Sequence, residues 1–206
     1  MALYEVLEND IHDAEAYERY KAAVTPMVKA AGGEYLVRDG AIDVLAGDWR
    51  PSRLVIFRWP DRAAADGFSS SPEYQPLKDI RLAASTTKVF VAVEGFDAPA
   101  APPADDPGAA APIYALLENE IHDPEVYERY KAAVKPMAEA AGAAYLTRDG
   151  AIDVLAGDWR PSRLVIFRWP SRAKMQAFFA SEEYRPWKEL RESVTTTKVL
   201  VVVEGV

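Results

Sequence analysis

The chain repeats itself: residues 4–95 align with residues 114–205 at a constant offset of 110, without an insertion or a deletion. Of the 92 aligned positions, 63 are identical. The longest unbroken match runs over 38–60 and recurs over 148–170. A period of this length is too long for a solenoid unit and fits a small domain with its own core. The sequence therefore predicts two copies of one domain in a single chain.

Alanine and proline dominate the segment 96–112 between the copies. Such a segment offers little that can pack, and proline-rich chain extends by about 3.1 Å per residue. We therefore expect one domain over 1–95, a tether over 96–112 and a second domain over 113–206. The tether is long enough for the two copies to pair within one chain.

The composition excludes several classes of protein. A formal net charge of -8 without a basic stripe argues against nucleic acid or an anionic membrane as the partner. The lack of cysteine excludes disulfides, iron-sulfur clusters and thiolate ligands. No targeting signal or membrane-spanning apolar run is present in the sequence, so we expect a cytoplasmic protein.

Each copy begins with a strand and a helix. Apolar residues over 3–11 predict the first strand, and Asp13 is placed to cap the helix that follows. Tyr17, Tyr20 and Val24 then recur at spacings of three and four, which predicts one buried helical stripe. We interpret these tyrosines, with Tyr74 and Phe68, as core residues.

The rest of each copy reads as two strands, a helical region and a last strand. An irregular second strand over 35–45 is interrupted at Asp39-Gly40, and the third strand follows over 53–59. A helical region over 62–82 leads to the fourth strand over 87–94.

The order strand, helix, strand, strand, helix, strand is typical of a ferredoxin-like domain, whose four-stranded antiparallel sheet carries both helices on one face. The strands over 53–59 and 87–94 are apolar at successive positions, which indicates burial on both faces. The sheet of the other copy is the natural cover for the second face. The predicted fold is therefore α+β, with two ferredoxin-like βαββαβ domains forming an intramolecular pseudo-dimeric α/β barrel.

Three motifs carry a resemblance to a known family. They are Asp-Pro-Glu-x-Tyr-x-x-Tyr over 123–130, Arg-x-Gly with Leu-x-Gly-Asp-Trp-x-Pro-x-Arg over 38–53, and Ser-Pro-Glu-Tyr over 71–74. In both copies the chain resembles the domain-of-unknown-function family thirteen-thirty. The resemblance implies the dimeric α/β-barrel superfamily and no established reaction, since its relatives include cofactor-free monooxygenases, cyclases, isomerases and haem-degrading proteins.

The two histidines, His12 and His122, are the first candidate catalytic residues. Each ends a predicted strand just before a helix, where the family would have threonine or valine. A neutral imidazole can act as a general base near physiological pH. The alternative is a solvent-exposed turn residue.

A second set combines arginine, aspartate and tryptophan and occurs twice, as Arg38, Asp48, Trp49, Arg53 and as Arg148, Asp158, Trp159, Arg163. An indole beside guanidinium groups could bind a planar or anionic substrate. The alternative is a hairpin turn in which Asp caps backbone amides and Arg pairs with Asp.

Glu8 and Glu118 are the third set of candidates, because each lies in a strand among apolar residues, as do Glu94 and Glu204. A carboxyl group inside a closed barrel would have a raised pKa and could act as acid or base. The alternative is an ion pair with Arg58 or Lys88.

These residues favour a cofactor-independent enzyme that acts on an aromatic or polyketide-like metabolite by isomerisation, cyclisation or another proton transfer. We expect no cofactor and no metal. A non-catalytic protein that binds or sequesters a small molecule is the alternative, and a haem- or metal-binding barrel is a second one. Whether the fused chains associate further stays open.

Overall fold

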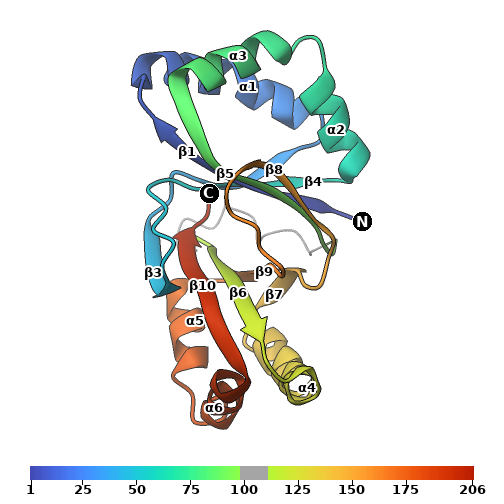
Figure 1. Ribbon diagram of the computed structural model, residues 1–206, viewed down its shortest axis with the longest axis vertical. Helices are drawn as coiled ribbons and strands as arrows, with labels where there is room; N and C mark the ends of the chain where they lie inside the picture. Colours follow the sequence, from blue (N-terminus) through green and yellow to red (C-terminus); the bar gives the residue numbers. More distant parts are fainter. Residues whose placement is uncertain (98–110) are drawn as a thin grey trace. The chain divides into compact units, whose positions relative to one another are not determined.

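The computed structural model describes residues 1–97 and 111–206, which form ten strands and six helices (Figure 1). The strands are β1 (Leu3–Ile11), β2 (Glu34–Arg38), β3 (Ile42–Gly47), β4 (Val55–Trp59), β5 (Ser85–Glu94), β6 (Ile113–Ile121), β7 (Ala144–Thr147), β8 (Ile152–Gly157), β9 (Val165–Trp169) and β10 (Thr195–Glu204). The helices are α1 (Ala14–Ala30), α2 (Arg62–Ser70), α3 (Gln75–Ala84), α4 (Pro124–Ala140), α5 (Arg172–Phe179) and α6 (Arg185–Val194). Most of the tether predicted over 96–112 lies outside the described residues.

The chain divides into two compact units, and neither is continuous in sequence. Unit 1 consists of Met1–Gly40, Pro51–Phe96 and Ala151–Arg160. Unit 2 consists of Ala41–Arg50, Asp97–Gly150 and Pro161–Val206. Each unit therefore contains a short segment that comes from the other repeat.

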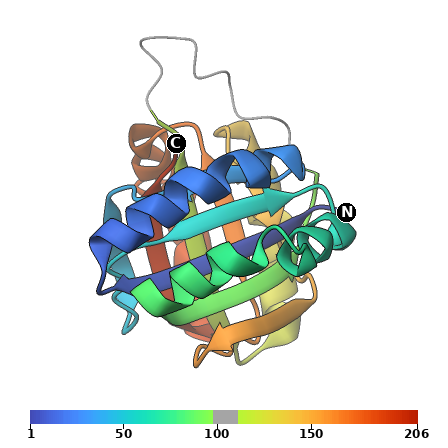
Figure 2. The same cartoon turned by 90° about the horizontal axis from the view of Figure 1, so that it is seen from above.

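Each unit contains one five-stranded antiparallel sheet, in the order β2-β4-β1-β5-β8 in unit 1 and β3-β10-β6-β9-β7 in unit 2. Four strands of each sheet are the predicted ferredoxin-like set, so the predicted α+β fold with two ferredoxin-like repeats is confirmed. Figure 2 shows unit 1 from its helix side, with the orange β8 beside the green β5 at the edge of the sheet.

The fifth strand corrects the prediction of a single second strand over 35–45. The chain forms β2, breaks at Asp39, and then forms β3, which pairs with β10 in the other unit. Asp39 has a φ of 60° and Asp149 a φ of 59°, a left-handed conformation that aspartate tolerates better than most residues. The interruption at Asp39 was therefore predicted correctly, but the destination of the strand after it was not.

Helix α1 forms as the sequence predicts. Asp13 is its N-cap, and Asp13 Oδ1 accepts a hydrogen bond of 2.9 Å from the backbone N–H of Ala16. Tyr17, Tyr20 and Val24 are buried in the core between helices and sheet. The helix therefore begins at its cap and is held by one apolar stripe.

The strands β4 and β5 are buried on both faces, as their apolar runs predict. Neighbours along β4, Val55 and Ile56, are 3% and 0% exposed, and neighbours along β5, Val91 and Ala92, are 0% and 1% exposed. None of the helices in the described part of the chain has the length and apolar character that a membrane crossing requires.

Two glycines bring the exchanged strands into register. Gly157 at the end of β8 has a φ of 82°, and a Cβ at this position would lie 1.9 Å from the carbonyl oxygen of Lys88. Gly47 at the end of β3 has a φ of 85° and the same distance to the carbonyl oxygen of Lys198. Only glycine allows both the left-handed backbone and this close approach.

We predict that Gly157→Ala destabilises the protein, because the new methyl group would push β8 away from β5. The free energy of unfolding should fall by at least about 2 kcal/mol, from the left-handed backbone and the lost strand pairing together. Urea denaturation followed by circular dichroism measures this change.

Gly67→Ala is the matched control, because Gly67 lies in α2 with nothing within 4 Å of its added Cβ. This variant should be neutral or more stable by up to about 1 kcal/mol. Equal stability of the Gly157→Ala and Gly67→Ala variants would contradict the role given to the exchanged strand.

Candidate binding site

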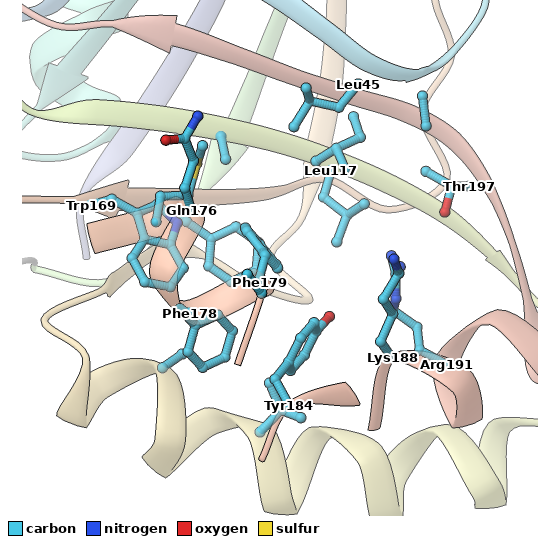
Figure 3. Close-up of a pocket in the computed structure, with 18 of the residues that line it drawn as sticks. Leu45, Leu117, Trp169, Gln176, Phe178, Phe179, Tyr184, Lys188, Arg191 and Thr197 are labelled. Atoms are coloured by element: carbon cyan, nitrogen blue, oxygen red, sulfur yellow. The ribbon is translucent and has the colours of Figure 1, made fainter. Parts of the chain in front are cut away.

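A cavity of about 530 Å³ lies between the helices and the sheet of unit 2 (Figure 3). Its lining residues on the strands are Asp43, Leu45, Ala46, Ala115, Leu117, Tyr145, Phe167, Trp169, Thr197 and Leu200. Those on or beside the helices are Tyr130, Val134, Ala138, Arg172, Met175, Gln176, Phe178, Phe179, Ala180, Tyr184, Lys188, Arg191 and Glu192. The exchanged strand β3 thus supplies part of the wall, so the site draws on both repeats.

Aromatic rings form one side of this cavity. The ring centroid of Phe178 lies 5.2 Å from that of Trp169 and 4.7 Å from that of Tyr184. Phe179 joins the cluster at 5.7 Å from Trp169 and 5.5 Å from Tyr184. Such rings present flat, apolar surface to a planar ligand.

Two basic residues of α6 stand on the other side, and Figure 3 shows Tyr184 between them and Trp169. Lys188 is exposed, whereas Arg191 is only 8% exposed. Arg191 Nη2 pairs with Glu192 Oε1 at 3.1 Å, and its buried Nε has no hydrogen-bond partner. The cavity therefore has a cationic end with donor capacity left over.

The hydroxyl groups of Tyr130 and Tyr184 lie 3.4 Å apart in the wall. Burial, and next the neighbouring Tyr184, raise the pKa of Tyr130 well above its ordinary value. The phenol of Tyr130 is therefore neutral at physiological pH and can donate a hydrogen bond.

The indole N–H of Trp169, like Nε of Arg191, is a buried group of the described lining that lacks a hydrogen-bond partner. Trp169 is 1% exposed, and its Nε1 has no hydrogen-bond partner. Leaving a buried donor unpaired costs about 1–3 kcal/mol, so an acceptor atom from a ligand would stabilise this group.

The same tryptophan in unit 1 is satisfied. Trp59 Nε1 donates a hydrogen bond of 2.8 Å to Glu5 Oε2, and the cavity beside it measures only about 80 Å³. Burial is the main cause that raises the pKa of Glu5 to about 7, and the negative charge of Asp66 adds to this effect. The hydrogen bond from Trp59 and the positive charges of Arg62 and Arg81 act in the opposite direction. Unit 2 has Ala115 at the position of Glu5.

His12 and His122 are exposed residues of the strand-to-helix turns, and neither belongs to the lining of the two cavities described above. The backbone N–H of His12 donates to the carbonyl oxygen of Ala84 at 3.0 Å. His122 Nε2 lies 2.8 Å from Thr196 Oγ1. This placement matches the alternative of a solvent-exposed turn.

The structure does not bring the set of arginine, aspartate and tryptophan into one unit. Arg38 and Arg53 belong to unit 1, whereas Asp48 and Trp49 belong to unit 2, and the second copy divides likewise between Arg148 and Arg163 on one side and Asp158 and Trp159 on the other. Each tryptophan of this set has an interaction partner.

The two arginines instead pack on tyrosines near the strand break. Arg38 lies 4.7 Å above the Tyr35 ring and donates to Thr25 Oγ1 at 3.0 Å, and Arg53 pairs with Asp39 and lies 5.1 Å above the Tyr17 ring.

The second repeat has the same arrangement at its strand break, where Arg163 Nε pairs with Asp149 Oδ1 at 2.9 Å. Partial burial would raise the pKa of Asp149, but the hydrogen bonds from Lys131 and Arg163 outweigh it and lower the pKa. The Arg-Asp pairing in the hairpin thus exists, with Asp39 and Asp149 as the acids in place of Asp48 and Asp158.

The candidate glutamates lie outside both cavities. Glu8 is 8% and Glu118 9% exposed, and each has an interaction partner. Glu94 lies 3.8 Å from Arg62, and Glu204 lies 3.4 Å from Arg172, so arginines of α2 and α5 lie near these two glutamates.

Sequence reasoning missed the residues that shape the cavity, above all Glu5 and Trp169. A usable signal was present: Glu5 is a charged residue within an apolar strand, and the second copy has alanine there. Position 5 and its equivalent 115 therefore distinguish the two copies, whereas the histidines and the repeated motifs are common to both.

Comparison with known proteins shows the family to which both repeats belong. A family model described as a domain of unknown function, DUF1330, matches residues 2–96 and again 112–206. A comparison with curated proteins finds no match.

Solved structures show the fold. The chain is similar to a protein provisionally assigned as a chlorite dismutase (9% identity, 100% of this chain and 94% of that one covered, TM-score 0.59). It is also similar to an anthrone oxidase-like protein (11%, 100% and 90%, 0.51) and to a DypB variant from Rhodococcus jostii RHA1 in complex with heme (12%, 99% and 92%, 0.53). At 9–12% identity these likenesses show the fold alone, and that fold agrees with the ferredoxin-like α+β architecture predicted from sequence.

We predict that Glu5→Gln makes the stability of the protein less dependent on pH. The carboxyl group is protonated up to about pH 7 in the folded protein, against an ordinary pKa of 4.5, so the folded state holds the proton more tightly. Its stabilising contribution is fully present below pH 4.5 and is lost as the pH rises through 7.

The wild type should therefore lose up to about 3 kcal/mol of stability over this window relative to Glu5→Gln, which keeps an acceptor oxygen for Trp59 but cannot ionise. Urea denaturation at a series of pH values measures the difference. Parallel curves for the two proteins would contradict the raised pKa.

Proposed function

The chain belongs in both repeats to the family described as a domain of unknown function, DUF1330, and from its site we propose that it binds a small aromatic molecule with an acidic group in the cavity of unit 2. One observation carries the proposal: a cavity of about 530 Å³ with aromatic rings on one side and two basic side chains on the other. Ligand pockets usually measure about 300–1,000 Å³ and combine apolar walls with a few placed polar groups.

Charge favours an acidic ligand. Lys188 and Arg191 face one carboxylate of the lining, Glu192, which pairs with Arg191 at 3.1 Å. The other carboxylate, Asp43, pairs with Arg172 at the edge of the cavity. Both acids are thus engaged with arginines, and the ammonium group of Lys188 supports an anionic group on the ligand.

Binding ranks above proton transfer because of what the lining contains. A general base must lie within hydrogen-bond reach of the proton that it takes. The described lining has no histidine, and its two carboxylates are ion-paired. His12, His122, Glu8 and Glu118 lie outside it, so the lining supports a binding protein better than an isomerase or cyclase that uses those residues.

A cofactor-independent enzyme remains the second candidate, because the lining is rich in donors. The indole of Trp169 and the phenols of Tyr130 and Tyr184 could stabilise negative charge on a ligand oxygen, which is the condition for enolate or phenolate chemistry. In this case the ligand would be released as a changed compound.

Haem, the ligand of the DypB variant, does not fit the described residues of the cavity. Haem iron needs an axial ligand, and the lining offers no histidine, while burial holds Tyr130 in its protonated form. Met175 lines the cavity, but methionine ligates haem iron together with a histidine. No group of three His, Asp or Glu side chains within 1–97 and 111–206 is placed to hold a metal.

We predict that Lys188→Ala weakens the binding of anthracene carboxylate by about fivefold, or roughly 1 kcal/mol, since one charge partner is lost. Binding of the neutral anthracene carboxamide should change little. Isothermal titration calorimetry with both probes measures the two affinities.

Lys78→Ala is the matched control, because Lys78 is the equivalent residue beside the small cavity of unit 1. It should leave the affinity for both probes unchanged. An equal loss in the two variants, or no binding of either probe to the wild type, would contradict the proposed site.

A further inference from the structure

The aligned tryptophans Trp59 and Trp169 occupy equivalent register positions in the two sheets but have different partners. Glu5 lies opposite Phe57 in the β1–β4 pair, and Ala115 lies opposite Phe167 in the β6–β9 pair. The backbone therefore presents both positions to the tryptophan in the same way. The carboxyl group of Glu5 accepts from Trp59 in unit 1, whereas Trp169 Nε1 in unit 2 has no partner.

Two further substitutions act in the same direction. Val28 and Phe90 line the cavity of unit 1, and their equivalents in the cavity of unit 2 are the smaller Ala138 and Leu200. Glu5, Val28 and Phe90 are thus bulkier than their equivalents in unit 2, whereas Met175 and Phe179 of unit 2 are bulkier than Ala65 and Ser69 of unit 1. The cavity nevertheless measures about 530 Å³ beside Ala115 and only about 80 Å³ beside Glu5, so the larger volume lies where the glutamate is absent.

We infer that the ligand of unit 2 presents an acceptor oxygen to Trp169 Nε1, in the place that the carboxyl group of Glu5 takes in unit 1, and that Ala115 leaves the space for it. This inference rests on the proposed function and deepens it. In unit 1 the side chain of Glu5 then occupies the place of the ligand, so one chain binds one ligand molecule.

The surroundings indicate which oxygen fits. The Trp169 side consists of aromatic rings, and Arg172 beside it is engaged with Asp43 and Glu204. Burial disfavours a charge at the equivalent place in unit 1, where the pKa of Glu5 is raised to about 7. A neutral carbonyl oxygen satisfies the indole N–H there without bringing a charge into an apolar wall. The ligand class is therefore an aromatic ketone or quinone whose acidic group reaches Lys188 and Arg191.

Two probes of equal shape test the hydrogen bond: anthraquinone carboxylate, which has ring carbonyl groups, and anthracene carboxylate, which has none. Wild type should bind the quinone more tightly, with one molecule per chain. Trp169→Phe should remove this preference, weakening the quinone by about tenfold, the effect of one hydrogen bond of about 1.4 kcal/mol, and leaving anthracene carboxylate unchanged. Trp59→Phe is the matched control and should leave both affinities as in wild type.

A second readout does not depend on affinity. The indole N–H signal of Trp169 in a proton–nitrogen correlation spectrum, identified by its loss in Trp169→Phe, should shift when the quinone is added and shift less with anthracene carboxylate. Ala115→Glu should abolish binding, because the new carboxyl group takes both the space and the donor. Ala115→Gln should do the same if the charged variant fails to fold.

Smaller side chains in the lining of unit 1 should enlarge its cavity until it binds a second ligand molecule. Glu5→Ala combined with Val28→Ala and Phe90→Leu should raise the stoichiometry from one to two. Equal affinity of the wild type for both probes, unaffected by Trp169→Phe, would overturn this inference and leave the proposed function standing. The absence of binding by either probe would overturn both.

Discussion

The structure depends on the exchange of β3 and β8 between the repeats. Neither repeat completes its own sheet, since the outer strand beside β5 comes from the second repeat and the one beside β10 from the first. The exchange is possible because Gly47 and Gly157 let one backbone approach another more closely than a side chain would allow. It also builds the site, because Asp43 and Leu45 reach the cavity of unit 2 on an exchanged strand. Duplication within one chain therefore supplies both partners of the exchange at once.

The identical and the differing positions of the two repeats lie in different parts of the structure. The unbroken match over 38–60 and 148–170 contains both exchanged strands and the strands β4 and β9 that carry the tryptophans. The differences gather where the lining comes from β1, β5 and the helices, as at Glu5 and Ala115 or Phe90 and Leu200. The matched segment maintains the strands that both units share, and the differing positions in the rest of each repeat make the two cavities unlike. Two equal folds with unequal cavities are what the proposed binding role of the second repeat requires.

Much of the fold could be predicted because it depends on interactions between residues that are close in the sequence. The apolar run over 3–11, the cap at Asp13 and the break at Asp39 all act within a few residues. The exchange could not, because residues 41–60 are identical to 151–170, and a strand with the same sequence fits either sheet equally well. The site was missed for a related reason: Trp169 is ordinary in sequence, and only its separation from any acceptor in three dimensions marks it. His12 stood out by rarity, but its place in an exposed turn is decided by the chain around it.

The contrast between Glu5 and Ala115 shows how a single position can divide two roles. A buried carboxyl group that satisfies an indole N–H keeps a cavity closed and fully paired, and removing it leaves a donor whose unpaired state costs about 1–3 kcal/mol. An acceptor atom on a bound ligand would offset this cost. The larger volume beside Trp169 and the basic residues of α6 supply the space and the charge for that acceptor. In the proposed complex the ligand therefore replaces the carboxyl group that pairs with Trp59 in unit 1, and the equivalent sheet position holds both tryptophans.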